Sequence, residues 1–148
     1  MIQQARQIAV ALLARRDHSR HEVVLKLQQK EISAEIAEQV ATEYESRGYI
    51  DDSRYSAIVI RSHISKGHGP IRIKQALAQK GVDKQIINQV FDQSDCDWYE
   101  LARMKAQKKY QDKPITEAKE RAKRIRFLVG QGFSFDQIAY ALDYDPDQ

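Results

Sequence analysis

The residue types in this chain that are best placed to do chemistry are basic side chains, which recur at helical spacings. One group surrounds the glycine turn at 67–69, and two others follow at intervals of one to four residues along later segments. Such sets neutralise phosphates or meet an acidic protein surface. We therefore predict partner or DNA contacts through ten residues: Arg61, Lys66, Arg72, Lys74, Lys105, Lys108, Lys109, Lys119, Lys123 and Arg126.

Residues that could support catalysis or metal binding lack the companions that this chemistry needs. Asp51 and Asp52 precede a helical pattern, where adjacent carboxylates act as a cap favoured by the helix dipole. His18 and His21 have no third and fourth ligand at suitable spacing, so we interpret them as surface histidines. Cys96 is the only cysteine, and its aspartate neighbours oppose thiolate formation. We predict no catalytic residue, no metal site and no cofactor.

The glycine-rich stretch Gly67-His68-Gly69-Pro70 lacks the Gly-Lys-Ser/Thr ending of a loop that cradles phosphate. Its simpler role is to end one helix and to start another, with Pro70 at the first helical position. We assign no role to His68. Together with the missing catalytic groups, this predicts a protein that is not an enzyme.

Charge is segregated along the chain, although the net charge is only +3. Residues 31–52 carry one basic and seven acidic side chains, whereas residues 54–84 carry seven basic and one acidic. Residues 97–130 hold ten basic side chains against five acidic, and residues 131–148 hold four acidic and none basic. Blocks of one sign indicate contact with a charged partner.

A repeat organises the elements that carry these charges. Residues 19–40 align with residues 69–90 at a shift of 50 without a gap, and a weaker third copy covers residues 124–142. A period of this size is typical of a repeat array, in which each unit buries its apolar face partly against its neighbours. We predict an elongated, all-α tandem array of three three-helix repeats, at 1–51, 52–96 and 97–148.

Helix signals support this division. Ser19 with Glu22 forms a predicted capping box, and Ser33, Asp83, Asp97 and Ser134 are placed to cap later helices. A further helix is expected to start at Thr116. Apolar stripes predict buried positions at Tyr55, Ile58, Val59 and Ile64, and most aromatic residues, Tyr49 and Phe135 among them, are expected in the core.

No stretch has the length of a membrane span. The apolar run from Ile8 to Ala14 is short, and it fits one face of an amphipathic helix better than a signal peptide. We expect a cytoplasmic protein. Because the apolar positions are consumed by the predicted core, we expect a monomer.

Four stretches of the sequence are more specific than the residues that begin and end helices. They are GYIDDSRYSAIVIRS (48–62), SKGHGPIRIKQALAQKGV (65–82), DWYELARMKAQKKY (97–110) and RFLVGQGFSFDQI (126–138). In this order and spacing the chain resembles the RecX family of recombinase regulators. The resemblance covers most of the chain.

The resemblance implies a modulator, usually an inhibitor, of the RecA recombinase in recombination, DNA repair and the SOS response. Members of this family bind the RecA filament on single-stranded DNA and damp its ATPase, strand-exchange and coprotease activities. Some also contact DNA directly. The family fold that the resemblance implies is three tandem three-helix repeats.

A second function remains open, which is a helix-turn-helix regulator of duplex DNA. The segment from Phe127 to Leu142 has a glycine turn followed by a capped helix. This helix carries Asp136 and is followed by Asp143, with no lysine or arginine, so it would present the wrong sign to phosphates.

Overall fold

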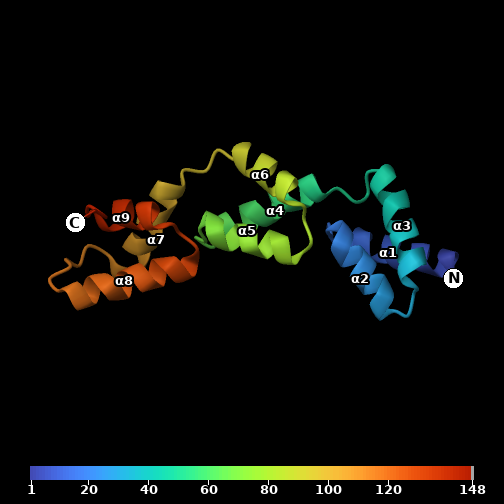
Figure 1. Ribbon diagram of the computed structural model, residues 1–148, viewed down its shortest axis with the longest axis horizontal. Helices are drawn as coiled ribbons and strands as arrows, with labels where there is room; N and C mark the ends of the chain where they lie inside the picture. The colour runs from blue at the N-terminus through green and yellow to red at the C-terminus, as the bar shows by residue number, and fades with distance from the viewer. Residues whose placement is uncertain (148) are drawn as a thin grey trace. The chain divides into compact units, whose positions relative to one another are not determined.

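The computed structural model describes residues 1–147, which form nine α helices and no strand. Figure 1 shows these helices following one another along the chain. Their bounds are α1 (Ile2–Arg15), α2 (Arg20–Gln29), α3 (Ala34–Ser46), α4 (Asp52–Ser65), α5 (Pro70–Gln79), α6 (Lys84–Asp92), α7 (Trp98–Tyr110), α8 (Ala118–Gln131) and α9 (Phe135–Leu142). The predicted all-α fold of three successive three-helix repeats is confirmed. None of the described helices is both long and apolar enough to span a membrane.

Side-chain caps fix where most helices begin. Ser19 and Glu22 form the predicted capping box at α2, and Ser134 with Gln137 forms a second one at α9. Ser33, Asp83 and Asp97 also accept hydrogen bonds from the first turns of their helices, as predicted. The predicted start at Thr116 is wrong, because α8 begins at Ala118 and its N-cap makes no side-chain hydrogen bond. Without a cap, only weak local preferences define that boundary.

The chain divides into two compact units that do not coincide with the sequence repeats. Unit 1 combines Met1–Ile58 with Leu77–Gln93, and unit 2 combines Val59–Ala76 with the segment from Ser94 onward. The middle repeat therefore contributes to both units. A repeat protein behaves in this way when each repeat packs against its neighbours as closely as within itself.

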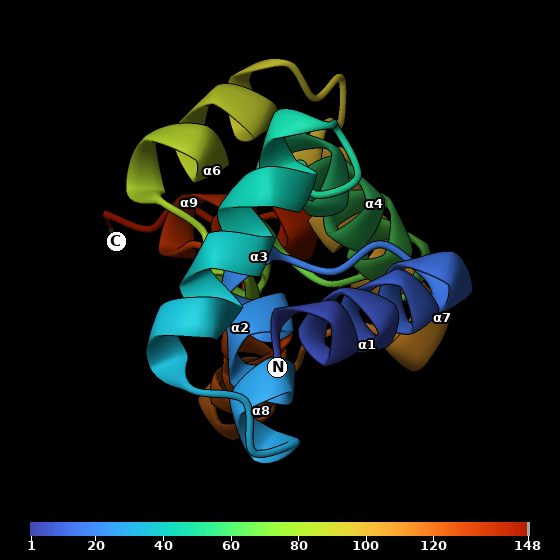
Figure 2. The same cartoon turned by 90° about the vertical axis from the view of Figure 1, so that its right-hand side faces the viewer.

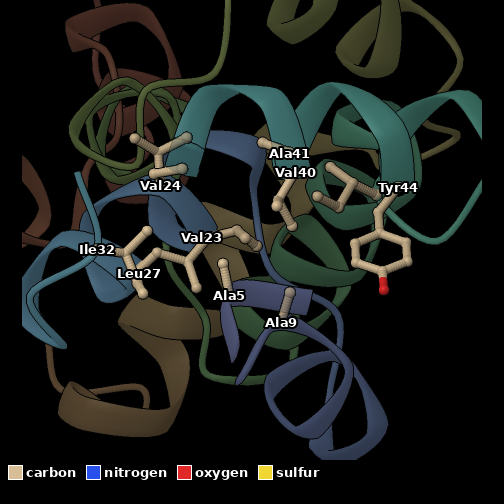
Figure 3. Packing of buried hydrophobic residues seen from close by; sticks show 11 residues of the cluster. Ala5, Ala9, Val23, Val24, Leu27, Ile32, Val40, Ala41 and Tyr44 are labelled. Carbon is tan, nitrogen blue, oxygen red and sulfur yellow. The ribbon is translucent and has the colours of Figure 1, made fainter. Parts of the chain in front are cut away.

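The core of unit 1 forms where α1, α2 and α3 lie against one another, at the front of Figure 2. Ala5 and Ala9 of α1 are fully buried, and their small side chains allow close approach to Val23 and Leu27 of α2. Figure 3 shows these side chains converging with Val40 of α3. The apolar face of α3 is thus part of the core.

The core of unit 2 joins α7, α8 and α9 through small residues on α7 and larger ones opposite them. Ala102 and Ala106 pack with Leu128, Phe133 and Ile138. Phe133 is 2% exposed, so the turn between α8 and α9 is held by a buried aromatic ring. Phe127 packs against this core and meets Tyr110 edge to face, with ring centroids 5.8 Å apart.

Three predicted core positions are wrong. Ile58 is 40% exposed, and Ile60 is buried instead, so the inward face of α4 is displaced from the predicted stripe. Tyr49 is 58% exposed and contacts Tyr44 edge to face. Phe135 is 68% exposed at the first position of α9, whereas Phe133 and Ile138 on either side of it in sequence are buried.

Candidate functional site

A junction between repeats occurs in unit 1, where the start of α2 packs against the turn between α5 and α6. The Ser19 hydroxyl donates to the carbonyl of Lys80 at 2.7 Å. Gly81 has a φ of +76°, and a Cβ there would lie 2.4 Å from Cβ of His21. Only glycine fits both the backbone conformation and the space. We call this contact the first junction.

The same arrangement recurs in unit 2, about fifty residues later, and we call it the second junction. Here the start of α5 packs against the turn between α8 and α9. The amides of Gly69 and Ile71 donate to the carbonyls of Gln131 (2.7 Å) and Gly132 (3.0 Å). A Cβ on Gly132, whose φ is +101°, would lie 2.4 Å from Cβ of Arg72. The sequence repeat therefore reflects a repeated mode of packing.

Acidic side chains neutralise the charge of the cations at the first junction. Glu22 is one of them. Its carboxylate lies 3.1 Å from Arg16 and 3.5 Å from Lys80, and it accepts from the Ser19 amide at 3.0 Å. Burial alone would raise the pKa of Glu22. The hydrogen bonds from Arg16 and Ser19 outweigh that effect and, with the charge of Lys80, lower the pKa to about 2.

Two further carboxylates complete this balance. Asp17 binds the guanidinium of Arg54 at 2.8 Å. Asp52 accepts from the amide of Arg20 at 2.8 Å, so it caps α2 from the following repeat. Of the predicted capping pair, Asp51 caps α4 itself, through the amides of Ser53 and Arg54. The cap interpretation is therefore right, but the two aspartates cap different helices.

The second junction lacks these carboxylates. Fifty residues after Asp17 and Glu22 stand Gly67 and Arg72, so one acid is missing and the other is replaced by a cation. The amine of Lys105 donates to the carbonyl of Lys66 at 2.9 Å, and its side chain covers Gly67. Arg72 reaches the carbonyl of Gly130 at 3.4 Å.

Five basic residues lie near one another at the second junction, and we name them the junction cluster: Lys66, Arg72, Lys105, Lys108 and Lys109. Within residues 1–147, no ion pair links any of them to a carboxylate. Partial burial lowers the pKa of Lys105, and the charges of Lys108, Arg72 and Lys109 lower it further. The cations are therefore close enough to repel one another.

A histidine pair lies among these cations. The Nδ1 atoms of His63 and His68 are 2.8 Å apart, a distance that requires one ring to donate and the other to accept. Burial lowers the pKa of His68 to about 4, helped by the charges of Arg72, His63, Lys105 and Lys66. Burial and the charges of Lys66 and Arg72 also lower the pKa of His63. Sequence reasoning missed this pair, because a helix end separates its members.

The structure brings together only half of the ten residues predicted from sequence. Arg61, Lys74, Lys119, Lys123 and Arg126 are exposed on α4, α5 and α8. Lys105, one of the ten, is half-buried against Gly67. The amine of Lys109 lies 4.3 Å from the Phe127 ring centroid, so part of its role is to cover that ring.

The remaining candidates for chemistry are in structural positions. The surface interpretation of His18 is wrong, since it is 3% exposed and its Nδ1 lies 3.0 Å from the Arg16 carbonyl. Burial raises the pKa of the Cys96 thiol, and Asp97 raises it further, as its acidic neighbours suggested. Throughout the described residues, no group of three or more potential ligands is placed to hold a metal ion.

Comparison with known families gives three matches in chain order. The first three-helix domain of RecX matches residues 5–43, the second matches residues 51–90, and the third matches residues 95–142. Regulatory protein RecX of Shewanella oneidensis is 50% identical over 116 residues, which cover 69% of this chain and 91% of that protein. Regulatory protein RecX of Vibrio campbellii is 41% identical over 143 residues, covering 97% and 92%.

Solved structures resemble this fold. A crystal structure described as regulatory protein RecX aligns with a TM-score of 0.80 at 24% identity, over 96% of this chain and 71% of the other. The crystal structure of RecX from Lactobacillus salivarius aligns with a TM-score of 0.81 at 23% identity, over 96% of both chains. At such identities the likeness concerns the fold alone.

Proposed function

We propose, from the premise that the chain belongs to the RecX family of regulatory proteins, that it binds the RecA filament on single-stranded DNA and inhibits it. Inhibition covers ATP hydrolysis, strand exchange and coprotease activity. The protein acts without catalysis of its own, as a monomer in the cytoplasm. Occupying a surface of the filament is sufficient for this activity.

The observation that carries the proposal is the contrast between the two junctions. In both, the start of one helix packs against a glycine turn and donates hydrogen bonds to its carbonyls, yet only the first contains the acids Asp17 and Glu22, which pair with Arg54 and Arg16. Repulsion among the cations of the junction cluster costs stability that a purely structural junction would avoid. An anion of a binding partner would relieve this repulsion, so the unbalanced charge favours binding of an anionic partner.

Both the phosphates of single-stranded DNA and the acidic side chains of a recombinase subunit meet this requirement. We expect the junction cluster to contact phosphates, because a row of phosphates offers several anions at fixed spacing to several cations. Unit 2 carries five further exposed cations on α4, α5 and α8, which are Arg61, Lys74, Lys119, Lys123 and Arg126.

ATP hydrolysis by preformed RecA filaments tests the proposal. The purified protein is titrated into filaments, and the rate of hydrolysis is followed. We expect hydrolysis to fall with added protein. The triple variant Lys66→Gln, Arg72→Gln and Lys108→Gln should need about tenfold more protein for the same effect, because three charged contacts are lost. Lys105 and Lys109 are left intact because their side chains pack on Gly67 and Phe127.

The matched control carries the same charge change on unit 1, through Arg15→Gln, Lys30→Gln and Lys84→Gln at three exposed positions. This variant should inhibit as the unmodified protein does. An equal loss of inhibition in both variants would show that the effect depends on the net charge of the protein and not on the junction cluster. Unchanged hydrolysis at saturating unmodified protein would refute the proposal.

The helix-turn-helix alternative gains no support from α9. Gln137, Ile138 and Ala139 are buried, and the exposed Asp136 carries the wrong sign for a helix facing phosphates. Sequence-selective binding to one duplex at physiological salt would revive this alternative.

A further inference from the structure

An open groove in unit 2 lies beside the second junction, and the RecX assignment does not account for it. It has a volume of about 410 Å³ and lies between the start of α5 and the turn from α8 to α9. Three of its lining side chains are apolar and well exposed: Ile71 (46%), Val129 (46%) and Phe135 (68%). Its size falls within the range of pockets that hold small planar groups.

The exposure of Phe135 is the least expected of the three, because this large aromatic side chain takes no part in the core of unit 2. Phe133, two residues earlier, already fills the space against Leu128 and Ile138. The Phe135 ring instead stands at the rim of the groove, where it exposes apolar surface to water. Large apolar side chains that cluster on a surface mark contact sites.

The walls of the groove are held rigidly. The hydrogen bonds from Gly69 to Gln131 and from Ile71 to Gly132 fix the start of α5 against the α8–α9 turn. The capping box of Ser134 and Gln137 fixes the backbone next to Phe135. A groove built on such contacts is formed before its ligand arrives, which lowers the entropy lost on binding.

The polar groups of the groove suit an anionic ligand with a planar part. Arg72 lines the groove and also belongs to the junction cluster, so it connects the apolar surface with the cations Lys66 and Lys105. The Gln75 amide also lines the groove and can form hydrogen bonds with a polar ring edge. Asp136, which follows Phe135, does not line it.

We propose that this groove takes one unpaired base of a single-stranded nucleic acid, stacked on Phe135, while Arg72 and Lys66 hold the neighbouring phosphates. The inference rests on the proposed function and names the part of the ligand that this groove recognises. A π face and an adjacent cationic track are the two features that bind single strands without sequence preference. A duplex offers no free base face along its length, so the groove selects single strands.

Equilibrium binding to bare oligothymidine, followed by fluorescence anisotropy, tests the inference. Phe135→Ala should lower affinity about five- to one-hundred-fold, the range for losing one stacked base. Phe135→Trp should retain affinity, because it keeps a large aromatic face. Tyr49→Ala, which removes another well-exposed aromatic residue, this one from unit 1, should leave affinity unchanged.

A strand of the same length with abasic residues in place of all bases separates stacking from charge. The unmodified protein should bind this strand more weakly than oligothymidine, whereas Phe135→Ala should bind the two strands alike. The slope of log affinity against log salt should not change in Phe135→Ala, because the phosphate contacts remain. It should become shallower by about 0.7 in Arg72→Gln.

Three outcomes would overturn the inference: no measurable binding of oligothymidine by the unmodified protein, equal binding of both strands by it, or full affinity in Phe135→Ala. If Phe135→Ala kept full affinity for bare strands but lost inhibition of RecA filaments, the groove would be a docking site for a protein side chain. The proposed function fails independently, when the unmodified protein leaves filament ATP hydrolysis unchanged.

Discussion

At the scale of single residues, the basic side chains fall into two kinds, those with an acidic partner and those without one. Arg16 and Arg54 belong to the first kind, since Glu22 and Asp17 neutralise them. Lys66 and Arg72 belong to the second: Lys66 corresponds to Arg16 in the repeat, and Arg72 stands where the first junction has Glu22. We expect the partnered residues to contribute to stability and the others to contribute to binding.

The histidine pair makes a prediction about pH. In the unfolded chain a histidine has a pKa of about 6.5, whereas His68 in the folded protein has a pKa of about 4. Between these values the unfolded state binds more protons, so the free energy of unfolding should fall as the pH falls. Urea unfolding at about pH 7 and about pH 5 measures this loss.

His68→Asn is the matched variant for this measurement, because its amide keeps a polar group near the Nδ1 position. The loss of stability between the two pH values should be smaller in this variant than in the unmodified protein. Glu22 contributes little between about pH 7 and about pH 5, because its unfolded pKa is near 4.5 and its folded pKa is about 2, so most of its loss occurs at lower pH. An equal loss in both proteins would contradict the assignment.

Single residues also mark the limit of prediction from sequence. The caps Ser19, Ser33 and Ser134 were predictable, because a cap bonds to amides within three residues of itself. The environments of His68 and Phe135 were not, because they depend on segments remote in sequence: Lys105 of α7 acts on His68, and the start of α5 lines the groove with Phe135. Helical periodicity is ambiguous at the first position of α9.

At the scale of elements, the two junctions explain why glycine stands at residues 81 and 132. Glu31, fifty residues before Gly81, also has a positive φ, +68°, and is exposed. A left-handed backbone alone therefore does not demand glycine in this fold. The helix start packed against the turn does, because it leaves no space for a Cβ.

Alanine substitutions separate these two effects. Gly48 has a φ of +80° with no atom within 4 Å of an added Cβ, so Gly48→Ala should cost only the backbone strain, about 1–2 kcal/mol. Gly81→Ala and Gly132→Ala should cost about 1–3 kcal/mol more, because the added methyl group overlaps His21 or Arg72. Thermal unfolding followed by circular dichroism measures the three variants. An equal loss of stability in all three variants would show that the junctions rearrange at little cost to make space for the added methyl group.

The elements themselves were largely predictable. Repeat, caps and apolar stripes together predict three successive three-helix repeats, since every signal is local or repeats at a fixed shift. The exceptions have physical causes. Thr116 does not cap α8, which begins without a side-chain cap. In α4, Ile60 is buried in place of Ile58, in a repeat whose residues are divided between the two units. The predicted boundaries at 51/52 and 96/97 stay predictions.

At the scale of the whole molecule, the charge blocks of the sequence are divided unevenly between the two units. The acidic block at 31–52 lies entirely in unit 1, together with Asp17 and Glu22. Unit 2 holds the junction cluster and the exposed basic residues of α8. The uneven distribution predicts that unit 2 contacts the polyanion, and this prediction is the central claim of the proposed function.

The dependence of filament binding on salt tests that claim most directly. Affinity for the RecA–single-stranded DNA filament is measured over a range of salt concentrations, for the unmodified protein and the two matched triple variants. If the junction cluster contacts phosphates, Lys66→Gln, Arg72→Gln and Lys108→Gln together should make the slope of log affinity against log salt shallower by about 2, at about 0.7 for each contact. The variant on Arg15, Lys30 and Lys84 should keep the original slope. An unchanged slope in the junction variant, or the same change in both, would contradict the account.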